Sequence, residues 1–152
     1  MRALIQRVKS ASIAVNGSIH GKIDKGILIF LGVTHTDTRE ATSYLAKRCS
    51  SLRIFEDAEG KMNLSVKEVN GSILVVSQFT LYADTTKGNR PGFVGAAQPL
   101  LAEQLYNEFV AHLRTEMGES KVATGVFRAM MDVSLVNEGP VTVMVESKNE
   151  GQ

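Results

Sequence analysis

Short apolar runs follow one another along the first part of the chain. Residues 2–8 and 11–15 alternate in part between apolar and polar side chains, which is typical of strands with one buried face. Asn16-Gly17 predicts a two-residue hairpin turn, because both central positions of that turn need positive φ, and residues 19–23 are the expected return strand. Residues 27–31 are apolar at successive positions, so we predict a strand that is buried on both faces.

Apolar residues at helical spacing predict two helices. Asp37, followed three residues later by Glu40, fits the N-cap and the capping-box partner of the first helix. Pro99 suits the first position of the second helix, and Gly118 is placed to end it. The apolar face of the first helix consists of Ala41, Leu45, Cys49 and Leu52, and that of the second consists of Leu101, Leu105, Phe109 and Leu113.

The remaining segments complete the predicted fold. A central strand is expected over roughly 71–82, and three more strands near 122–127, 131–137 and 140–146. A loop rich in Gly, Thr, Asn and Pro spans 84–98. We predict an α+β fold with a mostly antiparallel, barrel-like sheet and two packed helices. The length of 152 residues favours a single domain, residues 1–152.

Composition and charge indicate the cellular location of the protein and the kind of RNA contact it can make. No apolar stretch reaches the ~18–20 residues that span a bilayer, and the N-terminus lacks the apolar region of a signal peptide. We therefore expect a cytoplasmic protein without membrane contact. Cys49 is the only cysteine, so an internal disulfide is impossible, and we expect it in the core. With 17 Lys and Arg against 16 Asp and Glu, contact with RNA must be local.

The chain lacks the motifs of several common enzyme classes. His20, His35 and His112 have no metal-ligand spacing, and no Gly-x-Ser-x-Gly elbow occurs. A Walker-type phosphate loop and a dinucleotide-binding fingerprint are also missing from the sequence. Zinc hydrolases, serine hydrolases with this elbow and nucleotide-triphosphate enzymes are disfavoured, and we expect neither a metal nor a cofactor.

Two short segments carry the functional hypothesis. Ser77-Gln78-Phe79-Thr80-Leu81 ends an apolar run, and Asn137-Glu138-Gly139-Pro140-Val141-Thr142 joins two strand-like stretches. Structural roles would explain both, because Ser and Thr often end strands and Gly-Pro is a common turn. Alternatively, backbone N–H groups at the end of the first segment stabilise an oxyanion, an effect worth about 3–4 kcal/mol per donor. A cis peptide bond before Pro140 would make the preceding carbonyl a rigid wall.

Together, the two segments resemble the signature motifs of the D-aminoacyl-tRNA deacylases. The resemblance covers nearly the whole chain and includes Ile5-Gln6-Arg7-Val8, Arg53-Ile54-Phe55, Gly60-Lys61-Met62-Asn63, Arg90-Pro91 with Phe93, and Val133-Ser134-Leu135-Val136-Asn137. It implies an enzyme of translation quality control that hydrolyses the ester of D-aminoacyl-tRNA. It also implies a homodimer with its active sites at the subunit interface.

The resemblance assigns the catalytic side of the site to the first segment. Ser77, Gln78, Phe79 and Thr80 would line it, with the backbone N–H groups near Phe79 and Thr80 facing the scissile carbonyl. The 2′-hydroxyl of the terminal adenosine of the tRNA would assist hydrolysis. A nucleophilic Thr80 is the rival mechanism, but a Thr hydroxyl needs an activating base, and none stands nearby in the sequence.

The second segment is assigned to substrate selection. Gly139 and Pro140, joined by a cis bond and supplied by the partner subunit, would form a wall that excludes L-amino acids. Arg7 would brace this loop, and Met131 would contact the end of the substrate. Because exclusion acts on a side chain, glycine should also be cleaved, including glycine mischarged on tRNA(Ala).

Three cations are candidates for tRNA phosphate contacts: Lys87, Arg90 and Arg128. Arg128 is also a departure from the family pattern, which usually has a small residue there. Met130 stands where an acid is common, and Gly92 replaces a frequent Ser. These departures bear on rate and tRNA preference more than on reaction type.

Two alternative functions remain at this point. One is an editing deacylase for L-amino acids mischarged on tRNA, although Phe79 favours the D-specific form of the family. The other is a non-catalytic RNA-binding module of the same fold. Against that module, the chain has no Trp and only 3 Tyr for stacking on bases.

Overall fold

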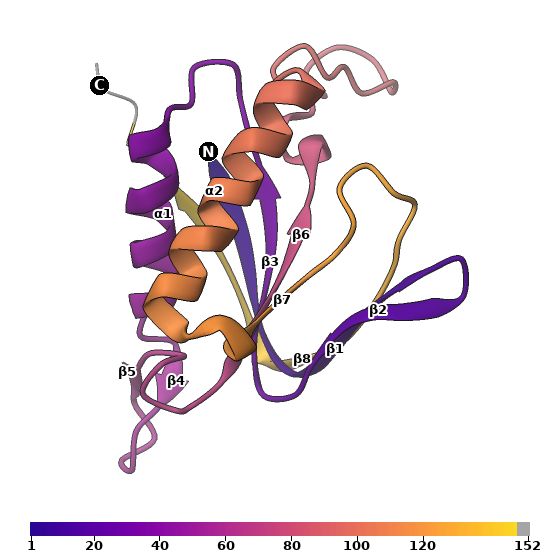
Figure 1. Ribbon diagram of the computed structural model, residues 1–152. Coiled ribbons are helices and arrows are strands. Elements are labelled where there is room, and N and C mark those ends of the chain that lie inside the picture. Colours follow the sequence, from indigo (N-terminus) through magenta and orange to yellow (C-terminus); the bar gives the residue numbers. More distant parts are fainter. Residues whose placement is uncertain (149–152) are drawn as a thin grey trace.

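The computed structural model describes residues 1–148 and shows two helices packed on a strongly curved sheet (Figure 1). The elements follow one another as β1 (Arg2–Val15), β2 (Ser18–Ile23), β3 (Gly26–Gly32), α1 (Arg39–Ser51), β4 (Phe55–Glu56), β5 (Met62–Leu64), β6 (Ser72–Ser77), the 3₁₀ turn η1 (Phe79–Tyr82), α2 (Pro99–Met117), the 3₁₀ turn η2 (Glu119–Lys121), β7 (Val122–Thr124) and β8 (Asp132–Glu146). In this described part of the chain, neither helix has the length and apolar character needed to cross a membrane.

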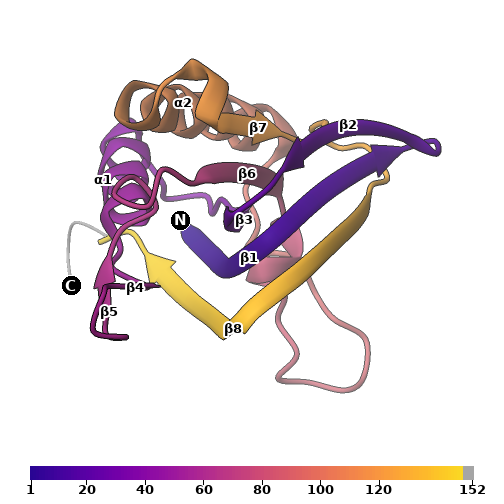
Figure 2. The ribbon, with the colours of Figure 1, turned by 90° about the horizontal axis from the view of Figure 1, so that it is seen from below.

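The long strand β1 organises the sheet. β8 pairs along one edge of β1, while the other edge pairs with β3 over residues 2–8 and with β2 over residues 11–15, all antiparallel. β6 and β7 extend the sheet beyond β3 in parallel pairs. β2 bends back toward β7, so that a Cβ placed on Gly21 would lie 2.7 Å from the Thr124 carbonyl oxygen. The sheet thus curls into an incomplete barrel (Figure 2), which confirms the predicted fold class.

Both faces of the sheet are buried, each by a different apolar cluster. Along β3, Ile27, Ile29 and Leu31 belong to the cluster beneath the helices, whereas Leu28 belongs to the cluster inside the curl. β6 repeats this alternation. A central strand covered on both sides needs apolar residues at successive positions. The prediction for residues 27–31 is therefore confirmed.

The helices lie side by side on one face of the sheet (Figures 1 and 2). As predicted, Pro99 starts α2 and Gly118, with φ of 97°, is its C-cap residue. The Tyr106 hydroxyl donates a hydrogen bond to the Val75 carbonyl at 3.0 Å and ties α2 to β6. Cys49 is buried in the core as expected, and burial raises the pKa of its thiol to about 12.

The start of α1 differs from the prediction. Thr38, not Asp37, is the N-cap residue, and no side chain within residues 1–148 caps the helix. The buried Asp37 carboxylate instead contacts the Met1 ammonium group at 2.5 Å and accepts a hydrogen bond from the Thr34 N–H at 2.7 Å. The capping-box assignment is wrong because a contact that is distant in sequence takes the carboxylate.

Several strand boundaries also differ. β1 and β8 are each continuous over residues predicted as two strands, because they pair with each other along most of their length. β6 ends at Ser77 rather than near residue 82, since the chain turns into η1. β7 ends at Thr124 rather than near residue 127, where the connection to β8 begins.

Candidate functional site

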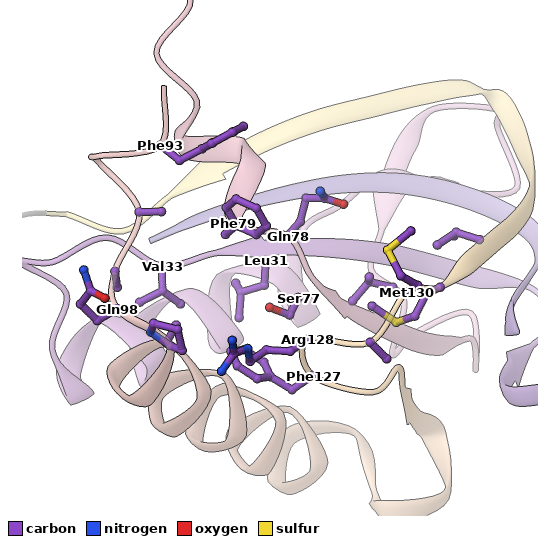
Figure 3. A pocket seen from close by; sticks show the side chains of 18 residues that line it. Leu31, Val33, Ser77, Gln78, Phe79, Phe93, Gln98, Phe127, Arg128 and Met130 are labelled. Carbon is purple, nitrogen blue, oxygen red and sulfur yellow. The ribbon is translucent and has the colours of Figure 1, made fainter. Parts of the chain in front are cut away.

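A pocket of about 590 Å³ opens where β6 ends (Figure 3). Its walls come from the ends of β3 and β6, the loop before α2, the first turn of α2 and the connection between β7 and β8. Most of the lining side chains are apolar. Five candidate site residues named from the sequence line this pocket: Ser77, Gln78, Phe79, Arg128 and Met131.

The chain leaves the sheet beside the pocket. Ser77 is the last residue of β6 and pairs with Leu31, and the Gln78 N–H still donates to the Leu31 carbonyl at 2.8 Å. At the first two positions of η1, the N–H groups of Phe79 and Thr80 donate to no other residue within 1–148. A helical turn leaves its first N–H groups without internal acceptors. Two backbone donors are therefore available next to the pocket.

The turn η1 is held in place by its close packing against β3 and by the side chain of Arg2. A Cβ on Gly32 would lie 3.1 Å from the Leu81 Cβ, so the missing side chain allows η1 to pack against β3. Arg2 donates to the Leu81 carbonyl at 3.0 Å, forms an ion pair with Glu146 at 2.6 Å and stacks on the Tyr82 ring. Burial raises the pKa of the Tyr82 hydroxyl well above its usual range. Arg2 was not among the predicted site residues, because no local pattern connects positions so far apart in the sequence.

Two aromatic rings form part of the pocket rim. Phe79 and Phe93 are 56% and 40% exposed, and their rings meet edge to face with centroids 5.1 Å apart. The Thr80 side chain is exposed and does not line the pocket, and Gln78 Nε2 donates to its hydroxyl oxygen. Of the first two residues of η1, Phe79 lines the pocket and Thr80 does not.

Gly139 and Pro140 lie in a bulge of β8. Residues 138–141 stand opposite the single residue Arg7 of β1. The Gly139–Pro140 peptide bond is cis, the isomer that the resemblance implies, and both residues are exposed. The buried Arg7 side chain donates from Nε to the Glu138 carbonyl at 3.0 Å and from Nη1 to the Ile54 carbonyl at 2.7 Å. Arg7 therefore holds the base of the bulge.

The two signature segments do not meet within one chain. Through the pairing of β6, β3 and β1, Ser77 lies in register with Val145, near the end of β8. Gly139 and Pro140 lie earlier in β8, opposite Arg7, and neither residue lines the pocket.

The three candidate phosphate ligands occupy different places. Lys87 and Arg90 are exposed in a loop closed by backbone hydrogen bonds between Asp84 and Gly92, and neither lines the pocket. Arg128 does line the pocket.

The histidines stand apart from the pocket wall, and His35 Nε2 lies 2.6 Å from the Val94 carbonyl oxygen. Over residues 1–148, no three His, Cys, Asp or Glu side chains are grouped so that they could hold a metal ion.

Curated relatives match the chain over almost its full length. A D-aminoacyl-tRNA deacylase from Desulfatibacillum aliphaticivorans is 61% identical over 148 residues, covering 97% of this chain and 100% of the relative. A D-aminoacyl-tRNA deacylase from Halothermothrix orenii is 53% identical over 150 residues, covering 99% of each chain. The family model described as D-Tyr-tRNA(Tyr) deacylase matches residues 4–146.

Two solved structures share the fold of this chain. The c-Myc DNA Unwinding Element Binding Protein has a TM-score of 0.93 at 39% identity, covering 97% of this chain and 99% of that one. A probable eukaryotic D-amino acid tRNA deacylase shares the fold, with a TM-score of 0.83 at 20% identity over 95% of this chain and 98% of that one. From the family match and the relatives, the chain belongs to the D-Tyr-tRNA(Tyr) deacylase family.

Proposed function

We propose that this protein hydrolyses the ester bond between a D-amino acid and the 3′ end of tRNA, releasing tRNA and the free amino acid. Its family makes it a hydrolase of the D-aminoacyl-tRNA deacylase type. The observation that carries the proposal is the pair of N–H groups at Phe79 and Thr80, which have no acceptor within residues 1–148 and lie beside a pocket of about 590 Å³. A pocket of that volume suits a ligand of nucleoside size.

In this mechanism, the ester carbonyl oxygen points at the two backbone donors. Water attacks the carbonyl carbon, and the negative charge that develops on the oxygen is stabilised by the N–H groups. The bond between the acyl carbon and the ribose oxygen then breaks, and the ribose oxygen takes up a proton. Because Gly32 and Arg2 hold η1 in place, the donors need little reorganisation during the reaction.

The substrate supplies the assisting hydroxyl. Among the described residues that line the pocket there is no His, Cys, Asp or Glu. We therefore assign the role of orienting and polarising the attacking water to the 2′-hydroxyl next to the ester. A nucleophilic Thr80 is less favoured, because Thr80 does not line the pocket and its hydroxyl oxygen accepts a hydrogen bond from the Gln78 amide, which is not a base.

We further propose that the active unit is a homodimer in which each subunit completes the pocket of the other. The exposed bulge at Gly139 and Pro140 does not line the pocket of its own chain, so a second copy would have to bring it there. A two-fold dimer would place both bulges equivalently. Main-chain atoms of the bulge would exclude an L side chain, while a D side chain would point to solvent. Glycine would not be excluded, including glycine on tRNA(Ala).

The test compares D-tyrosyl-, L-tyrosyl- and glycyl-tRNA in parallel with the purified protein. We expect hydrolysis of the D-tyrosyl and glycyl esters and an intact L-tyrosyl ester. Hydrolysis of the L-ester at the rate of the D-ester would favour the editing deacylase instead. Binding of tRNA without hydrolysis would favour the RNA-binding module. We place the activity in the cytoplasm, where tRNA is charged and used.

A further inference from the structure

Arg128 places an isolated positive charge in the wall of the pocket. Among the described residues that line it, Arg128 is the only one with a charged side chain. None of the ion pairs among residues 1–148 involves Arg128. The first turn of α2, which borders the pocket, contains no acidic residue. Within residues 1–148, the positive charge of Arg128 therefore faces the pocket with no acidic side chain in ion-pair contact.

The backbone of the connection between β7 and β8 sets the position of this arginine. The connection is anchored to β6 where the Gly125 N–H donates to the Val75 carbonyl at 3.0 Å. Arg128 itself has φ of 65°, in the left-handed region that residues with a Cβ seldom adopt. In Figure 3, its side chain extends across the pocket in the direction of Gln98, where α2 begins. The charged group is thus directed over the cavity.

We propose that Arg128 forms an anion subsite that binds the phosphate on the 5′ side of the terminal adenosine of the tRNA substrate. This inference rests on the proposed function. The amino-acid end of the substrate carries an ammonium group, which Arg128 would repel. The anion nearest to the ester is that phosphate, and a guanidinium group presents parallel N–H donors that match its oxygens. Arg128 therefore marks the nucleotide side of the pocket and sets the direction in which the substrate lies.

This role differs from that of the other two cations. Lys87 and Arg90 lie outside the pocket on an exposed loop, where they would contact phosphates farther from the ester. Contacts of that kind strengthen binding of any tRNA in a salt-dependent way. Arg128 instead recognises one phosphate at a fixed place relative to the scissile bond, so its effect should persist with a single nucleotide.

The test uses two stable analogues of the substrate end, 3′-(D-tyrosylamino)-3′-deoxyadenosine with and without a 5′-phosphate. Calorimetry measures their Kd with the wild-type protein and with Arg128→Ala. We expect the wild-type protein to bind the phosphorylated analogue roughly 10- to 100-fold more tightly, as for a charge-assisted hydrogen-bonded pair. Arg128→Ala should bind the two analogues equally, and Arg128→Lys should keep part of the preference.

Two control variants separate this effect from general charge and from folding. Arg48→Ala removes an exposed arginine on α1, outside the pocket, and should keep the full preference for the phosphorylated analogue. Arg128→Gly suits φ of 65° and should fold at least as stably as the wild-type protein while it binds both analogues equally.

Three results would overturn the subsite. One is equal binding of the two analogues by the wild-type protein, and another is an undiminished preference in Arg128→Ala. The third is inhibition by free D-tyrosine that depends on Arg128 when inhibition by AMP does not, because the anion would then be a carboxylate. None of these results would contradict the deacylase function, provided that the protein hydrolyses D-tyrosyl-tRNA. If it did not hydrolyse D-tyrosyl-tRNA, the proposed function itself would be rejected.

Discussion

Gly139→Ala tests whether the bulge in β8 is shaped by the missing side chain. Gly139 has φ of 125°, a conformation that L side chains rarely adopt. A Cβ at this position would lie 2.7 Å from Arg7 Nη2 and 3.0 Å from Val141 Cγ2. Arg7 is only 7% exposed and is held by hydrogen bonds to two carbonyl oxygens. It therefore has little room to move away.

The expected loss of stability has two contributions, the unfavourable backbone conformation and the displacement of the Arg7 side chain. Placing a residue with a Cβ in this backbone region costs about 1–3 kcal/mol. Displacing the guanidinium group weakens hydrogen bonds that are each worth about 1.5–3 kcal/mol when one partner is charged. Because the bulge can relax in part, we expect the free energy of unfolding to fall by about 2–4 kcal/mol. For a chain of this length, that loss lowers Tm by roughly 5–15 °C.

Urea unfolding followed by circular dichroism measures the stability, and hydrolysis of D-tyrosyl-tRNA measures the activity. Gly60→Ala is the matched control, because Gly60 also has positive φ, of 76°, but a Cβ there would meet nothing within 4 Å. Gly60→Ala should lose only about 1–2 kcal/mol and keep its activity. Gly139→Ala should lose more stability and most of its activity, and it should still leave L-tyrosyl-tRNA intact.

Two outcomes would refute this reasoning. If Gly139→Ala were as stable and as active as Gly60→Ala, the close approach to Arg7 would not matter. If it hydrolysed L-tyrosyl-tRNA, the bulge would not act by excluding L side chains.

Four further predictions concern the mechanism, the assembly and the core. Thr80→Ala should keep substantial kcat, whereas a substrate whose tRNA ends in 2′-deoxyadenosine should be hydrolysed far more slowly. If Thr80→Ala instead caused the larger loss and an acyl-Thr80 intermediate were trapped, Thr80 would be the nucleophile. Light scattering at assay concentration should find a dimer, and a fully active monomer would contradict the shared pocket. Gly32→Ala should lower kcat with little change in Tm, since η1 must shift by a few tenths of an ångström. Burial raises the pKa of Cys49 from 9.0 to about 12 and that of Tyr106 from 10.0 to about 12. The folded protein therefore holds protons that the unfolded chain releases, so stability should be full below about pH 9 and fall toward pH 12. Cys49→Ala should flatten this fall in a pH series of Tm measurements, and an unchanged slope would show that Cys49 does not contribute.

Elements with a local cause could be predicted from the sequence. Asn16 and Gly17 adopt φ of 50° and 79°, as the hairpin turn requires. Pro99 and Gly118 bound α2, because each residue acts through its own backbone geometry. The apolar run of β3 showed that both faces of this strand are covered. In the site, the string from Ser77 to Phe79 was recognisable by its resemblance to a family, and these residues do line one pocket.

Other features depend on contacts between residues that are distant in the sequence. Asp37 has the local signature of a helix cap, but its carboxylate is bound by the Met1 ammonium group instead. The end of β6 at Ser77 depends on Gly32, whose missing side chain gives η1 room.

The arrangement of the site was also decided in three dimensions. Only the strand register shows that Gly139 and Pro140 lie away from the pocket of their own chain. Likewise, only the pocket wall shows that Arg128 is the one charged residue among the described residues that line it. Periodicity and turn propensity record the conformation of neighbouring residues, whereas these features depend on which distant atoms share the same space, and that is determined only when the sheet and the helices pack together.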